Sequence, residues 1–280
     1  AASWMSALLE GAGEAQWIEE VNSAKIECID PTSIDRIFSE SARLSDQAIV
    51  DFVRGLCAVS KEEMDSTRDG SAVVDGIPRI FCMQKVVEIS SYNMSRIRIV
   101  WSRIWAILGE HFQAVALGPN VRLAMYAIDS LRQLALKFLE KEELTSFHFQ
   151  RDFLKPFDQM LLHSKSAEIR ELVIHCLTQL VLSSHARIRS GWRNVLHALA
   201  IAGRDRVEAV GALGLQLLVK IIEEYLAQLF EDRCFGQSAY SDTVHALAEF
   251  AANPLSPQQS VQAITLIGRV AHLRLSPPAA

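Results

Sequence analysis

The clearest pattern along this chain is a run of apolar residues at steps of three and four between positions 93 and 112. On a helix of about 3.6 residues per turn, such steps place the side chains in one stripe along one face. We therefore predict a helix here. Because Ile99 and Ala106 fall on the opposite side, we expect it to be covered on two faces within a stack of helices. The stripe consists of Ile97, Val100, Trp101, Ile104, Trp105, Leu108 and Phe112.

The same pattern returns later in the chain. Arg-Ile-Arg followed by a tryptophan occurs at 96–101 and again at 187–192, an offset of 91 residues. A second similarity has about half that offset, since the stretch 128–136 corresponds to 174–182 with a shift of 46 residues. Helical repeats of roughly 40–47 residues are typical of armadillo and HEAT proteins. The sequence therefore predicts an all-α fold, an armadillo/HEAT-like α-solenoid of stacked helical repeats.

Cap residues and apolar spacing divide the rest of the chain into further expected helices. Pro31 with Thr32 and Ser33 marks a helix start, and we expect Pro156 in the first turn of its helix or at a kink. Alternating apolar and polar runs of useful length are missing, so we expect no strands. The polar stretch 65–76 is expected to be a loop. The expected helices cover residues 5–9, 15–29, 31–38, 47–59, 78–89, 93–117, 120–139, 149–160, 166–182, 187–202, 205–230, 241–252 and 257–273.

Composition narrows the class of protein. The 280 residues are 50% hydrophobic and 22% charged, which supplies ample core material and argues against a disordered chain. The net charge of −5 argues against a nucleic acid as the main ligand. No apolar run approaches the roughly 18–20 residues that cross a bilayer. The chain begins without a charged leader, so we expect no signal peptide and expect a piece cut from a longer protein.

Motifs that carry chemistry are not found. The spacings HExxH, GxSxG and GxxxxGK[ST] do not occur, and the eight histidines never stand at zinc-ligand spacing. The five cysteines form no CxxC pair, so we expect reduced thiols in a cytosolic compartment. We therefore expect no enzyme activity, no cofactor and no metal in this chain. The cysteines are Cys28, Cys57, Cys82, Cys176 and Cys234.

Clustered basic residues are the candidates for partner binding. Two interpretations are open. In the first, the basic side chains pair with acids such as Asp129 and Glu168 or stay solvated, as exposed charges usually do. In the second, they bind an acidic segment, a GTPase surface or anionic lipid headgroups. The candidates are Arg96, Arg98, Arg103, Arg132 and Lys137, and the later copy of the pattern adds Arg187, Arg189 and Arg193.

Three tryptophans could also take part in binding. Trp101, Trp105 and Trp192 lie on the repeated apolar stripe, which favours packing in the core. The alternative is a tryptophan at the rim of the helix stack that anchors a partner. We expect core packing for all three.

Long stretches of the sequence resemble the large brefeldin-A-inhibited guanine-nucleotide exchange factors for Arf GTPases, the Sec-seven class. The resemblance is to the region downstream of their catalytic domain, and it covers about residues 30–195. It implies a helical lead-in at 1–30 and three successive homology boxes at 31–117, 118–190 and 191–280. The stretches that carry it are residues 38–59, 85–105, 127–143, 149–157 and 168–192, which include FSESARLSDQAIVDFVRGLCAV and KVVEISSYNMSRIRIVWSRIW.

The resemblance implies regulation and not catalysis, because the exchange domain is not among these residues. The implied partners are a GTP-bound Arf-family GTPase, the protein's own exchange domain and other regulatory domains, and the Golgi membrane surface. The implied location is the cytoplasm, with peripheral recruitment to Golgi and trans-Golgi membranes. The alternative function is a helical-repeat scaffold or transport adaptor that binds peptide or protein partners in a concave groove.

Overall fold

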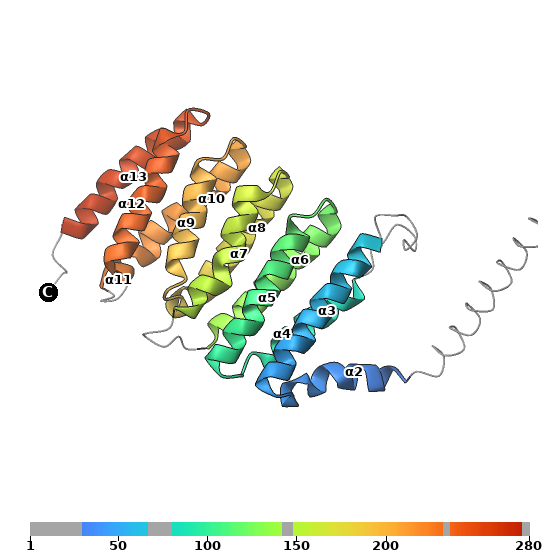
Figure 1. Cartoon of the computed structure of the whole chain (residues 1–280). Helices are drawn as coiled ribbons and strands as arrows, with labels where there is room; N and C mark the ends of the chain where they lie inside the picture. Colours follow the sequence, from blue (N-terminus) through green and yellow to red (C-terminus); the bar gives the residue numbers. More distant parts are fainter. Residues whose placement is uncertain (1–29, 67–79, 142–147, 232–235, 276–280) are drawn as a thin grey trace, which may run out of the picture.

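All regular structure that the computed structural model describes is helical. The described residues are 30–66, 80–141, 148–231 and 236–275. The helices stand side by side in chain order, from α3 near one end to α13 at the other (Figure 1). The prediction of an all-α chain is therefore confirmed for these residues. The helices expected at 5–29 lie outside them, as does most of the expected loop at 65–76.

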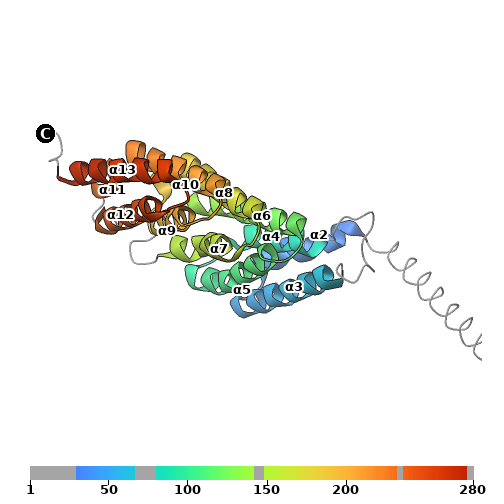
Figure 2. The same ribbon diagram turned by 90° about the horizontal axis from the view of Figure 1, so that it is seen from above.

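The helices form two layers, which Figure 2 shows from above. In the layer that we call the front layer, α3 contacts α5, α5 contacts α7, α7 contacts α9, and α9 contacts α12. In the rear layer, α4, α6, α8, α10 and α13 contact one another in the same successive way. Consecutive helices pair across the layers, as α3 does with α4 and α5 with α6. Each helix pair therefore packs mainly against the pairs before and after it.

The helix bounds agree with the periodicity to within a few residues at most ends. The front helices are α3 (Asp46–Ser66), α5 (Arg98–Ala116), α7 (Phe149–His163), α9 (Trp192–Gly203) and α12 (Gly236–Ala252). The rear helices are α4 (Phe81–Asn93), α6 (Val121–Leu139), α8 (Ala167–Ser184), α10 (Glu208–Lys220) and α13 (Pro257–Leu275). The remaining segments are α2 (Pro31–Ser39), two 3₁₀ turns (Glu40–Arg43 and His185–Arg187), a π-helical turn (Ile221–Tyr225) and α11 (Leu226–Glu231).

The two copies of the repeated pattern take equivalent places. The copies with the 91-residue offset lead into α5 and α9, both in the front layer, and those with the 46-residue offset lie in α6 and α8, neighbours in the rear layer. Trp101 and Trp192 are 2% and 3% exposed, and Trp105 is 3% exposed, so core packing is confirmed for all three. The assignment to the armadillo/HEAT class stays a prediction.

Two details of α5, the helix predicted from the first copy of the repeated pattern, differ from the sequence prediction. Ile97 precedes α5 in an extended conformation, with ψ at 144°, so the helical period does not apply to it and its side chain is 65% exposed. Ile99 is 69% exposed and Ala106 is exposed as well. The expected cover on two opposite faces is therefore wrong. Front-layer neighbours and α6 bury one side of α5, and the opposite side faces solvent.

Pro156 lies well inside α7, so of its two expected positions the first turn is excluded. A proline has no backbone N–H, which leaves the carbonyl four residues earlier, that of Asp152, without its usual helical donor. The indole Nε1–H of Trp105 donates to this carbonyl at 3.1 Å. The Trp105 ring also stacks on Phe153 at a centroid distance of 4.0 Å. A side chain of α5 thus completes the hydrogen bonding of α7.

The helix expected at 205–230 is present but interrupted. It begins as α10, passes through a π-helical turn and continues as α11. Gly214 lets α10 approach the front layer closely, because a Cβ atom there would lie 2.7 Å from the Cβ of Ala202 and 3.3 Å from the ring of Phe250. The buried apolar side chains form one cluster that continues from Phe38 to Val270. The layers therefore share a single core along the described chain.

Candidate partner-binding surface

Arg96 holds its own fold together. Its guanidinium donates to three backbone carbonyls between residues 41 and 44, at 2.6 to 3.1 Å, and pairs with the Asp46 carboxylate at 3.2 Å. Its Nε donates to Asn93 Oδ1 at 2.7 Å. The side chain is only 12% exposed. Arg96 therefore fixes the turn before α3 against the end of α4, and little of it faces a partner.

The two candidates on α6 have intramolecular contacts as well. Arg132 donates to the Asp129 carboxylate at 2.6 and 2.9 Å, one turn earlier, and is 22% exposed. This is the pairing with Asp129 that the sequence left open. Lys137 is exposed, and its Nζ donates to Ser91 Oγ of α4 at 3.2 Å. Both side chains lie in the rear layer.

The two candidates on α5 lie in the front layer. Arg103 is exposed and donates to Gln47 Oε1 of α3 at 2.8 Å. Arg98 is half-buried at the start of α5, where it lines a hollow of about 200 Å³ together with Trp101 and Phe138. Arg96, which lies between α4 and α5, lines the same hollow, whereas Arg103 contacts α3 and the other two candidates lie on α6 in the rear layer. The role of all five in partner binding stays a prediction.

A different set of polar side chains meets on the front layer. Three adjoining hollows, which together we call the front trough, cross α5, α7, α9 and α12. The largest two have volumes of about 620 Å³ each, one between α7, α9 and α12 and one between α5 and α7. Asp152 and Lys155 line both of them. A smaller hollow of about 100 Å³ shares Arg151, Arg193 and Asp242 with the first, so the three are continuous.

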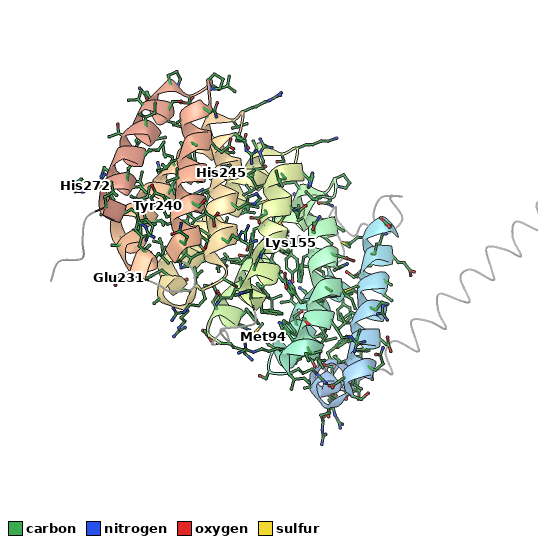
Figure 3. All side chains as sticks on the ribbon, turned by 60° about the vertical axis from the view of Figure 1, so that its left-hand side comes forward. Met94, Lys155, Glu231, Tyr240, His245 and His272 are labelled. Atoms are coloured by element: carbon green, nitrogen blue, oxygen red, sulfur yellow. The ribbon has the colours of Figure 1, made fainter. Side chains whose placement is uncertain are left out.

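Helical spacing explains why these side chains face the same way. Arg151 and Lys155 stand four residues apart on α7, and Arg193 and His197 do so on α9, which places each pair on one helix face. Figure 3 labels Lys155 on α7 and His245 on α12, which line the same hollow. In the described part of the chain, Arg151, Lys155 and Arg193 form no ion pair and no side-chain hydrogen bond. All three are exposed.

A buried polar group forms the floor of the front trough. Asp158 is 5% exposed, and its Oδ2 accepts from Asn194 Nδ2 at 2.9 Å and lies 3.4 Å from His197 Nδ1. Burial raises the pKa of Asp158, and the hydrogen bond with Asp158 raises the pKa of His197. Asp158 Oδ1 and Asn194 Oδ1 are buried and have no hydrogen-bond partner among the described residues. These two oxygen atoms are enclosed by protein and do not face the hollow.

Sequence reasoning found only part of this surface. It singled out Arg193 as one of the arginines in the later copy of the repeated pattern, but it did not select Arg151 or Lys155. The i, i+4 spacing was the available signal, yet many exposed helix faces have such pairs. Among the described residues there is no group of three or more potential metal ligands, and no described helix is long and apolar enough to cross a bilayer.

Comparison with known proteins gives consistent matches. The family model described as Mon2/Sec7/BIG1-like, HDS, matches residues 137–220, which contain α7, α8, α9 and α10. Brefeldin A-inhibited guanine nucleotide-exchange protein 1 of human and of mouse is 45% identical over 235 residues. The Arabidopsis thaliana protein of the same name is 39% identical over 234 residues. Each match covers 84% of this chain but only 12% or 13% of the relative, so the chain spans about an eighth of their length.

Proposed function

Because this chain belongs to the brefeldin A-inhibited exchange-protein family as a segment of the HDS region downstream of the Sec7 domain, we propose that it regulates and localises an Arf exchange factor. In this proposal the segment is not catalytic. It binds a GTP-bound Arf-family GTPase and restrains or positions the protein's own exchange domain. The observation that carries the proposal is the match to the HDS model, which includes α7 and α9, two of the four helices that line the front trough.

The architecture suits a protein-binding role. Two layers of successive helix pairs give a long face whose side chains come from helices far apart in the sequence. Repetitive helical arrays commonly use such extended faces to bind other proteins. We further propose that the layers form an armadillo/HEAT-like solenoid, divided into homology boxes at 31–117, 118–190 and 191–280. The other regulatory domains and the peripheral Golgi and trans-Golgi membrane surface are proposed as additional partners.

The experiment that tests this function compares nucleotide states of the GTPase. The 280-residue chain is immobilised and incubated with Arf loaded with a non-hydrolysable GTP analogue or with GDP. We expect retention of the GTP-bound form and little retention of the GDP-bound form. Equal retention of both forms, or of neither, contradicts the proposal.

Membrane recruitment needs a separate measurement. In a flotation assay with anionic vesicles, we expect the chain to float when GTP-loaded, membrane-anchored Arf is present. If exposed basic residues such as Arg103 and Lys137 contribute directly, flotation decreases with added salt, because salt screens exposed charges. Flotation that is independent of both Arf and salt argues against this part of the proposal.

The alternative function is a helical-repeat scaffold that binds peptides or proteins in its groove without responding to a GTPase. The front trough favours it, since a continuous groove across four helices accommodates a polypeptide. Indifference to the nucleotide, together with capture of a peptide ligand, distinguishes this alternative from the first proposal.

A further inference from the structure

The front trough has the dimensions of a site for an extended polypeptide. It crosses four packed helices, and packed helices lie about 8–10 Å apart, so its length is on the order of 30 Å. An extended chain covers about 3.3 Å per residue, which corresponds to about ten residues. We propose that the front trough binds an acidic, extended segment of a partner protein, whose carboxylates pair with Arg151, Lys155 and Arg193.

The charges at the α7–α9–α12 end of the trough favour an acidic partner. The three cations are exposed and form no ion pair in the described residues, although Asp242 lies near Arg151 and Arg193 and Asp158 lies near Lys155. His197 and His245 line the same hollow. Acidic partners lower the energy of such a cluster, and the attraction is strongest inside a groove walled by protein.

The acids in the trough offset these cations only in part. Asp158 is buried and already engaged by Asn194 and His197. Asp242 is half-buried; burial raises its pKa, against the opposing effect of the nearby Arg193 and Arg151. Asp152 is exposed and lines both large hollows, and Glu110 lines the hollow between α5 and α7. The acidic part of the ligand is therefore expected over α7, α9 and α12, and less charged residues over α5.

The extent of the trough favours a polypeptide over a single phosphate group. Arg151, Lys155 and Arg193 come from two helices and line hollows that continue across four helices. An extended peptide with several carboxylates can pair with all three cations.

This proposal does not depend on GTPase binding. The segment it describes is a short acidic stretch, whereas the GTPase proposal concerns a folded partner in one nucleotide state. Either can therefore fail while the other holds. A charge change in the trough that abolishes peptide binding but leaves retention of GTP-loaded Arf intact separates the two.

Fluorescence anisotropy tests the proposal with a defined probe. The probe is a fluorescein-labelled peptide of about ten glutamates, matched in length to the trough, and the control peptide is made of glutamines. We expect the 280-residue chain to bind the glutamate peptide, more weakly as salt is added. The double substitution Arg151→Glu with Arg193→Glu should weaken binding at least about tenfold.

Two controls make the result decisive. Lys165→Glu with Arg206→Glu changes the net charge by the same amount at exposed positions outside the trough, and should leave affinity within about twofold. Thermal unfolding should change little in either double variant, because all four side chains are exposed and none forms an ion pair in the described residues. Equal weakening by both double variants shows non-specific charge attraction and overturns the proposal.

Vesicles provide the competing outcome. Vesicles containing a phosphoinositide are titrated into the wild-type chain and into both double variants. Failure of the glutamate peptide to bind, combined with vesicle binding that Arg151→Glu with Arg193→Glu abolishes, assigns the cations to lipid headgroups and overturns the proposal. Peptide binding that requires Arg151 and Arg193, whatever the vesicles do, supports it.

Discussion

The indole of Trp105 donates a hydrogen bond to the backbone carbonyl of Asp152 at 3.1 Å, the carbonyl that Pro156 leaves without a helical donor. Two helices of the front layer are thereby joined at the point where one of them lacks a backbone hydrogen bond. The proline and the tryptophan come from sequence positions about fifty residues apart, and the structure makes them interdependent.

We predict that Trp105→Phe destabilises the protein by about 1–3 kcal/mol beyond the loss of packed area, because the Asp152 carbonyl loses its donor. Trp101→Phe is the matched control, since Trp101 Nε1 is buried without a partner among the described residues and no hydrogen bond is lost. Urea unfolding of both variants measures the difference. Pro156→Ala should restore part of the stability in the Trp105→Phe background by supplying a backbone N–H. A Trp101→Phe variant as unstable as Trp105→Phe contradicts this account.

Truncation of Trp101 should be severe. The ring is 2% exposed and packs near Trp105, Phe138 and Phe149, with ring centroids 6.3 to 6.5 Å away. Trp101→Ala leaves a cavity in this aromatic cluster, and we expect a loss of about 3–5 kcal/mol in the free energy of unfolding. Chemical denaturation followed by circular dichroism measures it. A loss below about 1 kcal/mol would place the ring outside the core.

Charge reversal should distinguish a structural arginine from an exposed one. Arg96→Glu removes the donors to three carbonyls and places a second carboxylate beside Asp46, so we expect a loss of about 3 kcal/mol. Arg103→Glu, at an exposed position on α5, should change stability by less than about 0.5 kcal/mol. Melting temperatures of the two variants provide the comparison. Equal melting temperatures of the two variants would contradict a structural role for Arg96.

His111 should make the protein sensitive to mild acid. Burial lowers its pKa to about 4, while the unfolded side chain titrates near its ordinary value of about 6.5. Below the pKa of His111 in the unfolded chain, the unfolded chain binds a proton at His111 that the folded protein does not bind. Stability is therefore fully present above about pH 6.5 and falls as the pH decreases toward 4. The expected loss is up to about 3 kcal/mol.

The measurement for His111 is the free energy of unfolding as a function of pH in the wild type and in His111→Gln. The glutamine can still bond with Ser60, whose Oγ lies 3.2 Å from the histidine Nε2, but it does not titrate. We expect a smaller decrease between about pH 6.5 and 4 in the variant. Parallel curves for the two proteins would show that His111 does not cause the acid sensitivity.

Much of the fold could be predicted from local pattern because helical burial is periodic. The spacing around Trp101 and Trp192 predicted two equivalent helices, and the structure places both in the front layer. Ile97 was assigned to the stripe because its spacing fits a helix, but the backbone is extended there. Periodicity specifies a helix face without saying where the helix begins, and it does not reveal whether a neighbour covers the second face.

The candidate surface was less predictable because its residues meet only in three dimensions. Arg96 looked like a free cation, yet its guanidinium bonds Asp46 and the carbonyls of the turn before α3, about fifty residues earlier in the chain. The front trough combines Arg151, Arg193 and Asp242, each from a different helix. Each helix that lines the front trough comes from a different part of the sequence, so no short stretch contains more than one of them. Only the packing of α7 against α9, and of α9 against α12, shows that these side chains share one groove.

The pairing of each helix mainly with its immediate neighbours has a consequence for how the molecule comes apart. In such a structure no single helix contacts all the others, so the helices at one end can unfold while those at the other end stay folded. The α7 helix occupies the middle of its row, with two front helices on one side and two on the other. Amide protons of α7 should therefore exchange more slowly with solvent than those of α3 or α13, and the trough walls that α7 and α9 provide should persist after the termini have opened.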